Sequence, residues 1–468
     1  MRILVLAFRN PAPQINGTAI RTYNMSRLLT RVHDVDILFV DTQRGSGTVE
    51  ADMAIFGHVS AHRVGLWHRA LNITRALFTG EAIQLHYFQC PDVRHWIRQH
   101  RTRYDAAMCF HIRMAPYLDD FPGWRVIDMI DATSLLYRQG RHHAPLPWKW
   151  IYAWEQETLQ RAELRAVNSF DRVLISSAYD RDYLLNLGAA PRADRISVCP
   201  NGVDDHLLHA PIQHTEDRVV FVGNMKYPPN FTAVIRFCKE CWPAVRHAMP
   251  QANFFIVGHS PSATVRDLGR MPGVHVTGFV DDPSDYLTRG TVVVAPLTFT
   301  AGIQNKVLEA MAAGKPVVAS PVAVRGIEGK PGTHYVVASN SEETAAAVVD
   351  LLGNPTRRRS IGTAARDLVC QRYRWELQAD VVLKAFAPAT RPREPGHRPS
   401  QYFIPPPPRR FHPRRVKRQP CGVCSQRTIF CQSVTHIMDE IIHTLHPAKL
   451  LILPVDLPLH ACRLEFIA

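Results

Sequence analysis

The chain has 468 residues, of which 46% are hydrophobic and 21% are charged, and its formal net charge is +14. This length is about three times that of a typical domain, which predicts two globular domains with an appendage and excludes a single small module, global disorder or a collagen-like repeat. Residues 388–468 hold 12 Lys and Arg against 5 Asp and Glu, which is half of the net charge. The rest of the chain is therefore only mildly basic, which argues against a nucleic-acid partner.

Residues 1–200 alternate short β-branched runs with longer amphipathic stretches. Short apolar runs bounded by turn residues indicate buried parallel strands, and helical spacing of apolar residues indicates the helices between them. The first run follows a basic residue, as in a signal peptide, but no small-residue cleavage site comes after it, so we interpret it as a strand. The predicted strands are Arg2–Phe8, Val35–Val40, Asp105–Phe110, Arg125–Ile130 and Arg172–Ser176, and the clearest predicted helices are Thr18–Arg31 and Trp148–Asn168.

The same alternation begins again after residue 217. The predicted strands there are Arg218–Val222, Asn253–Val257, Val274–Thr277, Thr291–Ala295 and Pro316–Ala319, with helices that include Asn230–Arg246 and Ile303–Ala313. Strands that alternate with helices predict an α/β fold with two doubly wound, Rossmann-like domains. Turn residues at Cys199–Asp204 mark the boundary between domains at 1–200 and 201–386, the second closed by a last helix. Ligands in such folds bind beyond the carboxyl ends of the strands, so the cleft between the two domains is the candidate site.

The tail, residues 387–468, differs in composition from the two domains. It contains 13 of the 35 prolines among many arginines, which predicts a disordered extension. A zinc site is one alternative, because Cys421 and Cys424 have metal-ligand spacing and are followed by Cys431 and His436. A misread carboxyl terminus is another.

The six cysteines of residues 1–386 have no regular spacing. This pattern predicts a reducing compartment without a disulfide scaffold, and hence a cytoplasmic protein. Cys238 and Cys241 lie in an amphipathic stretch rather than at the start of a helix, so we expect two packed thiols without redox chemistry. The longest apolar runs are far below the roughly 18 residues that span a bilayer.

The segment 302–318 contains the most informative pattern, a loop that opens a helix and leads to a new strand. Free backbone N–H groups at Gly302, Ile303 and Gln304 would form an anion site at the start of the helix. Lys306 and Glu309 are three residues apart, so they share one helix surface. A cation beside a phosphate and a carboxylate beside sugar hydroxyls would suit a nucleotide diphosphate sugar. An exposed Lys–Glu pair on an ordinary helix is the alternative.

With two further motifs, this segment resembles family 4 of the GT-B glycosyltransferases. The motifs are the domain-joining Pro200–Asp204 and Phe221–Met225 at the start of the donor domain. The resemblance covers roughly residues 1–386. The sequences of Gly302–Lys306 and Tyr227–Asn230 are similar to those of sugar transferases from bacterial exopolysaccharide gene clusters. It implies a GT-B fold and a retaining, hexosyltransferase-type enzyme that needs no metal or other cofactor. The implied partners are a nucleotide diphosphate sugar donor and a glycan or lipid-linked acceptor.

The resemblance also suggests roles for individual residues. Glu309 would bind the ribose hydroxyls, and Gly17 would lie in the glycine loop near the donor phosphate. One departure concerns the donor sugar: the family has two glutamates separated by seven residues, of which Glu309 is the later, and this chain has Ala301 at the earlier position. The predicted donor-binding residues are Gly17, Gly223, Lys226, Gly302, Ile303, Gln304, Asn305 and Glu309, and the predicted catalytic residues are His111, Lys306 and Asp131.

Several of these residues have a structural alternative. Lys226 either replaces a phosphate contact of the family or is merely exposed, and His111 either contacts the donor sugar or is a buried or helix-capping histidine. Asp128 and Asp131 follow a predicted strand, where they would bind the acceptor or act as a base, or serve the fold. Arg21 would reach a phosphate from the first helix or remain an exposed helical arginine.

Three functions compete at this stage. The leading hypothesis is sugar transfer in exopolysaccharide or cell-surface glycan synthesis, in the cytoplasm or in peripheral contact with an anionic membrane at its inner face. A GT-B-like sugar-nucleotide epimerase would share the donor fold, and a non-catalytic nucleotide-sugar binder would be consistent with Ala301. Nicotinamide chemistry is disfavoured because neither Leu4–Gly17 nor Val222–Asn230 contains a Gly-x-Gly-x-x-Gly turn.

Overall fold

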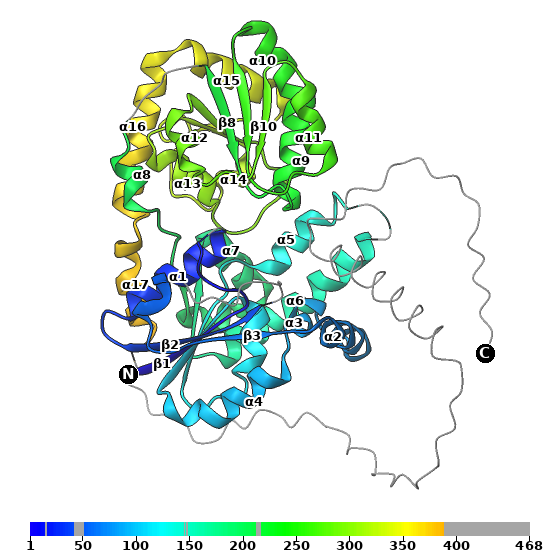
Figure 1. The fold of residues 1–468 in the computed structure, drawn as a ribbon, viewed down its shortest axis with the longest axis vertical. Helices are drawn as coiled ribbons and strands as arrows, with labels where there is room; N and C mark the ends of the chain where they lie inside the picture. The colour runs from blue at the N-terminus through cyan, green and yellow to red at the C-terminus, as the bar shows by residue number, and fades with distance from the viewer. Residues whose placement is uncertain (15, 42–50, 145, 147, 212–216, 388–468) are drawn as a thin grey trace, which may run out of the picture.

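The computed structural model describes residues 1–387 except 15, 42–50, 145, 147 and 212–216. Two parallel sheets, each covered by helices, form two lobes that lie one above the other in Figure 1. The predicted disordered tail and the alternative zinc ligands Cys421, Cys424, Cys431 and His436 lie outside the described residues.

The first domain is built on a seven-stranded parallel sheet with the order β3-β2-β1-β4-β5-β6-β7. Its central strands are buried on both faces, as helices on both sides require, and all five residues of β4 are buried. The strands are β1 (Arg2–Ala7), β2 (Asp34–Asp41), β3 (Val59–Arg63), β4 (Ala106–Phe110), β5 (Trp124–Asp128), β6 (Arg172–Ile175) and β7 (Ile196–Val198). The helices are α1 (Gly17–Leu29), α2 (Leu66–Thr79), α3 (Ile83–Tyr87), α4 (Pro91–His100), α5 (Thr133–Gly140), α6 (Trp148–Ser169) and α7 (Ala178–Leu184).

The second domain is built on a six-stranded parallel sheet with the order β10-β9-β8-β11-β12-β13. Its strands are β8 (Arg218–Val222), β9 (Asn253–Val257), β10 (Val274–Gly278), β11 (Val292–Ala295), β12 (Val317–Ala319) and β13 (Val336–Val337). Its helices are α8 (Asp205–His209), α9 (Pro228–Arg236), α10 (Trp242–Ala248), α11 (Ala263–Asp267), α12 (Ser284–Arg289), α13 (Asn305–Ala312), α14 (Pro321–Val324), α15 (Ser341–Gly353) and α16 (Pro355–Arg372). The α/β prediction with two doubly wound domains is confirmed.

All ten predicted strands are present, and three further strands were missed. The missed strands are β3, β7 and β13, and each lies at the edge of a sheet or is only two residues long. They are short or partly exposed, because an edge strand has a neighbour on one side only. The residues of β3, for example, are all partly or fully exposed.

One predicted helix is interrupted. The stretch Asn230–Arg246 is divided between α9 and α10, which are separated by a π-helical turn at Phe237–Cys241. Pro243 stands at the start of α10, where its missing backbone N–H removes one α-helical hydrogen bond and favours the wider turn. Cys238 and Cys241 are buried free thiols in this segment, as predicted.

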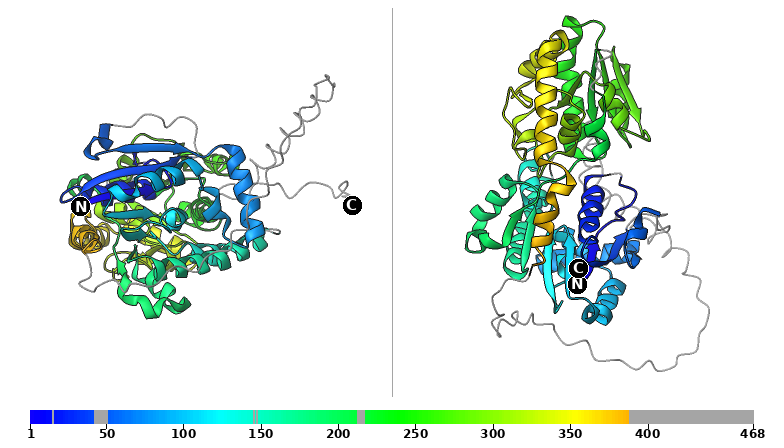
Figure 2. Two further views of the ribbon diagram at one scale, coloured as in Figure 1. Left: turned by 90° about the horizontal axis from the view of Figure 1, so that it is seen from below. Right: turned by 90° about the vertical axis from the view of Figure 1, so that its left-hand side faces the viewer.

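The end of the described chain returns to the first domain. After α16, a 3-10 helix (Trp375–Gln378) and α17 (Ala379–Lys384) run down beside α1, as Figures 1 and 2 show. Trp375 and Phe386 belong to the same buried cluster as the strands of the first sheet, and Trp124 Nε1 donates to the carbonyl of Ala385 at 2.9 Å. The sequence predicts this closing segment as part of the domain at 201–386. In the structure it packs in the core of the first domain.

Candidate active site

The loops after β5 and β6 of the first domain meet the loop after β11 of the second domain at Gly302. Gly302 has a left-handed backbone (φ +65°), which favours glycine. A Cβ atom there would lie 3.1 Å from Asp131 Cβ and 3.2 Å from Ser176 Oγ, so the two domains are in van der Waals contact at this point. The N–H of Gly302 donates to the Asp180 carboxylate, 3.2 Å from Oδ2. The loop amide predicted to bind an anion is therefore bonded to a carboxylate of the other domain in this closed arrangement.

The next two residues of the loop hold its shape. Ile303 is buried in the core of the second domain. Gln304 is the residue before α13, and its side-chain amide donates to Thr300 Oγ1 at 2.6 Å and to the carbonyl of Ala301 at 3.2 Å. Both side chains are thus used to position the start of α13.

Lys306 lies in the first turn of α13 and points back toward the end of β8. Its ammonium donates to Asn230 Oδ1 and lies 4.7 Å from the centre of the Phe221 ring. A Cβ on Gly223 would come within 3.1 Å of the Lys306 Nζ, so only glycine leaves room for the ammonium there. Burial lowers the pKa of Lys306 to about 7, although Glu309 acts in the opposite direction.

Glu309 follows one turn later on the same helix. Burial raises its pKa to about 7; the charge of Asp204 adds to this and Lys306 opposes it. Within the part of the chain that the structure describes, the Glu309 carboxylate has no ion pair or hydrogen bond, and it is not paired with Lys306. The helix therefore carries a cation and a carboxylate that are both partly removed from water and separately available.

A buried polar chain connects α13 to the first domain. Asn201 donates from Nδ2 to Asn305 Oδ1 at 2.6 Å and accepts from Arg21 Nη1 at 2.8 Å. Arg21 in turn makes a bidentate ion pair with Asp128, with bonds of 2.6 and 3.0 Å, and both side chains are fully buried. Asp128 thus has the structural role that was one of its two alternatives. For Arg21 neither alternative holds, because its side chain is fully buried rather than exposed and its charge is satisfied by Asp128 rather than by a phosphate.

Gly17 makes this connection possible. A Cβ at Gly17 would lie 3.1 Å from Asn305 Nδ2, so the start of α1 can approach the start of α13 closely. Asn16 fixes the first turn of α1 by accepting the N–H of Ala19 at 3.0 Å. The structure thus brings Gly17 and Asn305 together, as the prediction of a shared donor site requires.

His111 ends β4 and faces the loop after β5. Its ring is buried, its Nδ1 accepts the N–H of Arg113 at 3.4 Å, and its Nε2 lies 3.4 Å from Thr133 Oγ1. Burial, together with Arg113 and Arg9, holds the pKa of His111 well below its usual value. The ring is therefore neutral, and with Nδ1 as an acceptor the hydrogen is on Nε2, which can donate but cannot act as an acid near neutral pH.

Asp131 also lies beside the Gly302 loop. It accepts a hydrogen bond from Thr133 Oγ1 at 3.4 Å, and burial together with the charge of Asp180 raises its pKa to about 7. Asp180 itself accepts from Ser177 and from the N–H of Ala132 at 3.2 Å, and burial raises its pKa. A carboxylate that titrates near neutral pH in this position has the properties of a general base.

Lys226 is a predicted site residue that the structure does not bring together with the others. Its side chain is exposed, and no hydrogen bond or ion pair of that side chain is present in the described residues. The phosphate contact proposed for it therefore has no support from its surroundings, in contrast to Lys306.

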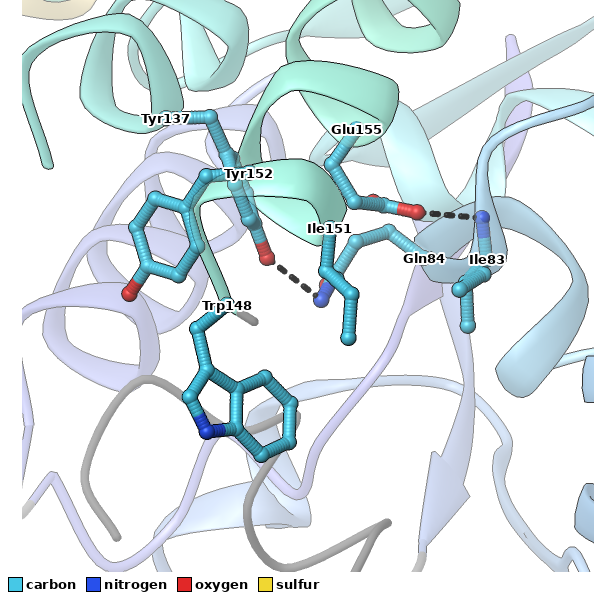
Figure 3. A pocket seen from close by; sticks show the side chains of 7 residues that line it. All are labelled: Ile83, Gln84, Tyr137, Trp148, Ile151, Tyr152 and Glu155. Atoms are coloured by element: carbon cyan, nitrogen blue, oxygen red, sulfur yellow. Dashed lines mark hydrogen bonds between the residues drawn. The ribbon is translucent and has the colours of Figure 1, made fainter. Parts of the chain in front are cut away.

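Two hollows lie beside these residues and share Tyr137 and Tyr152. One lies between α3, α5 and α6 and contains the Glu155 side chain (Figure 3). There the Gln84 amide donates to the Tyr137 hydroxyl at 2.8 Å, and Glu155 Oε1 accepts the N–H of Ile83 at 2.6 Å. The other is lined by both domains, through Leu136, Tyr137, Tyr152, Tyr227, Pro229 and Phe299.

Family models match most of the described chain. The model described as Glycosyltransferase Family 4 matches residues 15–207, and the model described as Glycosyl transferases group 1 matches residues 216–354. The chain is a family 4 glycosyltransferase. No curated protein sequence matches this glycosyltransferase significantly.

Solved structures show the same GT-B fold at low sequence identity. Sucrose-phosphate synthase from Thermosynechococcus elongatus is 18% identical, with a TM-score of 0.63 over 82% of this chain and 98% of that chain. Anabaena HepE in complex with UDP-glucose is 15% identical, with a TM-score of 0.59 over 82% and 98% of the two chains. S. aureus TarM, solved with UDP, is 12% identical, with a TM-score of 0.61 over 83% and 100%.

The described part of this glycosyltransferase contains no group of three or more His, Cys, Asp or Glu side chains placed to hold a metal ion. Among the same residues, none of the helices is long and apolar enough to cross a membrane.

Sequence reasoning missed three residues of the assembled site: Arg113, Asp180 and the Lys306 partner Asn230. Asn230 belongs to the segment Tyr227–Asn230, which contributed to the family resemblance, so the sequence did contain a pattern that could have indicated it. Arg113 and Asp180 lie in segments that carry no motif, and only the fold brings Asp180 to the Gly302 loop and Arg113 into the vicinity of Asp131.

Proposed function

We propose that this glycosyltransferase retains anomeric configuration and moves a hexosyl group from a nucleotide diphosphate sugar to a glycan or lipid-linked acceptor, in the cytoplasm and in the synthesis of an exopolysaccharide or cell-surface glycan. The observation that carries the proposal is the environment of Lys306, a half-buried ammonium held by Asn230 against Gly223 at the carboxyl end of β8. The solved complexes of HepE with UDP-glucose and of TarM with UDP support a nucleotide-sugar donor.

On the donor side, Lys306 has the role of stabilising the diphosphate as it leaves. A phosphate beside Lys306 would offset the burial that lowers its pKa to about 7, so the donor itself would keep the ammonium protonated. Charge that develops on the leaving oxygen then meets a cation already in place, which is the arrangement that lowers a barrier most effectively. Glu309, one turn further along α13, accepts hydrogen bonds from the ribose hydroxyls.

On the acceptor side, His111 and Asp131 have complementary roles. The neutral His111 ring presents its Nε2–H to a hydroxyl of the donor sugar. The ionised Asp131 carboxylate orients the acceptor hydroxyl and takes its proton as the new bond to the anomeric carbon forms and the bond to the diphosphate breaks. The raised pKa of Asp131, about 7, makes it a stronger base than an exposed aspartate.

A panel of nucleotide diphosphate sugars, screened by thermal shift and followed by product analysis, tests this function. A ligand at 100 times its dissociation constant stabilises the folded state by about 2.7 kcal/mol, which a thermal shift detects readily. Transfer to an added glycan supports the proposal, whereas release of an epimer without an acceptor would replace it with the epimerase.

Glu309→Ala gives the sharper test of the donor site. Loss of a carboxylate that accepts buried hydroxyls should weaken nucleotide binding by about 1–3 kcal/mol without loss of folding. Glu342→Ala, an exposed glutamate in the first turn of α15, is the matched control. Unchanged nucleotide affinity of Glu309→Ala in calorimetry would remove Glu309 from the site.

Peripheral contact with an anionic membrane is part of the proposal, and the first domain offers a surface for it. Trp67 and Phe78 on α2 are 59% and 92% exposed, and Trp150 on α6 is 76% exposed. The sequence of α2 contains His and Arg but no acidic residue, and exposed Arg161 of α6 donates to the carbonyl of Gly80 just after α2. Aromatic and basic side chains together are typical of surfaces that bind lipid head groups.

Sedimentation with vesicles tests the membrane contact. The protein should sediment with vesicles that contain an anionic lipid and much less with neutral vesicles, and salt should weaken the binding. The double variant Phe78→Ser, Trp150→Ser should lose the binding while its nucleotide affinity stays unchanged. Equal sedimentation of that variant and the unmodified protein would exclude this surface.

A further inference from the structure

Arg113 is a partly buried arginine in the wall of the first domain, two residues after His111. It lies in a 3-10 helix, Ile112–Tyr117, that directly follows β4. Its guanidinium carbon is 4.8 Å from the centre of the Phe8 ring and 5.2 Å from that of Phe88. Phe8 follows β1 and Phe88 follows α3, so two separate segments fix the position of this one cation.

No anion accompanies it. Within the residues that the structure describes, the Arg113 guanidinium makes no hydrogen bond and no ion pair, and its Nε is buried without a partner. Burial, together with the positive charge of Arg9, lowers the pKa of Arg113 to about 10. The two aromatic rings compensate this charge only in part, because cation–π contacts are weaker than a hydrogen-bonded ion pair.

Arg21 shows what a satisfied arginine looks like in the same domain. It is fully buried, and it makes two hydrogen bonds to Asp128 and a third to Asn201. Burying a guanidinium is costly unless a negative group pairs with it. Arg113 has a buried, unpaired Nε but a partly exposed side chain, so an anion from outside the chain can reach it and supply the negative group that Arg21 has in Asp128.

The surroundings of Arg113 place it at the reaction centre. Asp131 and Glu155 are close enough to act on it electrostatically, yet neither lies within ion-pair distance of it. Burial raises the pKa of both carboxyl groups to about 7, so part of each is uncharged near neutral pH and competes weakly for the guanidinium. Asp131 touches the Gly302 loop, so an anion on Arg113 would lie next to the sugar being transferred.

We propose that Arg113 is the anion-binding residue of the acceptor site, where it pairs through two parallel N–H donors with a phosphate or carboxylate group that the acceptor carries. The inference rests on the proposed function and narrows its acceptor to an anionic one. The planar fork of a guanidinium matches both phosphate and carboxylate oxygens. Arg113 is a specificity-determining residue in this arrangement, whereas Asp131 accepts the proton.

The donor diphosphate is the competing source of negative charge. It is disfavoured because Lys306 and the start of α13 already provide its site on the second domain. Arg113, in contrast, is held entirely by rings of the first domain. The experiment separates the two sources.

Calorimetry on UDP-saturated protein tests the proposal, with glucose 1-phosphate, glucuronate and glucose as probes. The unmodified protein should bind one of the two anionic sugars at least tenfold more tightly than glucose. A preference for glucose 1-phosphate assigns a phosphate, and a preference for glucuronate assigns a carboxylate. Arg113→Gln should abolish the preference and leave the affinity for UDP within twofold, and Arg113→Lys should retain part of it.

A control variant and a control titration complete the experiment. Arg75→Gln, an exposed arginine on α2, should change neither affinity. Equal binding of all three sugars to the unmodified protein, or an unchanged preference in folded Arg113→Gln, overturns the proposal. A tenfold loss of UDP affinity in Arg113→Gln also overturns it and assigns Arg113 to the donor. The titrations are repeated without UDP, so that a protein that binds no nucleotide refutes the proposed function and still reports on Arg113.

Discussion

Asp128 and Asp131 are three residues apart at the end of β5, yet they lie in regions with opposite electrostatic properties. Asp128 belongs to a fully buried cluster with Arg21 and Asn201 in which every charged atom has a partner. Asp131 faces the Gly302 loop beside Arg113, where neither group has an ionic partner and both have shifted pKa values. Satisfied charges hold the domains in place, and unsatisfied charges mark the place where a substrate completes the site.

Breaking the satisfied cluster should have the largest effect. Asp128→Ala leaves the Arg21 guanidinium buried without its bidentate partner, which should cost about 3–5 kcal/mol of stability. Asp350→Ala is the control, because it removes an exposed ion pair with Arg357 and should cost less than about 1 kcal/mol. Urea unfolding measures both. A loss of activity in Asp128→Ala at full stability would instead place Asp128 among the catalytic groups.

Lys306→Ala should leave stability nearly unchanged but lower turnover by about 10²–10³-fold, because it removes a cation positioned for the leaving group. Nucleotide affinity should fall much less than turnover, since the interaction strengthens in the transition state. Lys239→Ala, an exposed lysine of the same domain, should change neither. Equal losses of binding and turnover would reduce Lys306 to a phosphate anchor.

Alanine substitutions at two glycines with similar backbone conformations separate the effect of backbone strain from the effect of the contact between the domains. Gly302 and Gly332 have φ values of +65° and +79°, but a Cβ at Gly332 would meet no atom within 4 Å. Both alanine variants should lose about 1 kcal/mol or slightly more from backbone strain. Only Gly302→Ala should also lower turnover, because its methyl group would press on Asp131 and Ser176. Similar turnover in the two variants would show that the contact at Gly302 has no part in the reaction.

The sequence predicted the donor half of the site far better than the acceptor half. Lys306 and Glu309 lie on one helix within one continuous motif, so their spacing alone places them on a common surface. Arg113, Asp131 and Asp180 come from three separate segments, and their proximity depends on the order of β4, β5 and β6 in the sheet. Neither the periodicity nor a local motif carries that information.

The same reasoning explains the fold-level results. Buried central strands have continuous apolar runs and were all predicted, whereas β3, β7 and β13 have too little buried surface to leave a pattern. The return of α17 to the first domain could not be predicted from the sequence either, because its apolar residues fit the core of either domain. Packing against α1 and the bond from Trp124 to Ala385 decide between them.

The most specific effect concerns pH. Burial and Asp180 raise the pKa of Asp131 from 3.8 to about 7, so the folded protein binds a proton at this site that the unfolded chain releases above about pH 4. Stability contributed by this proton is therefore lost as the pH rises from about 4 to 7. Asp131→Asn should remove that slope and make the protein about 1–3 kcal/mol more stable than the unmodified enzyme at pH 8.

Activity should respond to the same substitution in the opposite sense. In the unmodified enzyme, kcat/KM should rise with pH as Asp131 ionises and fall above pH 7 as the free enzyme loses the Lys306 ammonium, whose pKa is lowered to about 7. Asp131→Asn should be nearly inactive and lose the rising limb, while Asp128→Asn, if it folds, should keep it. A pH profile of Asp131→Asn that retains the rising limb would show that another group is the base, and Asp131 would then join Asp128 as a residue of the fold.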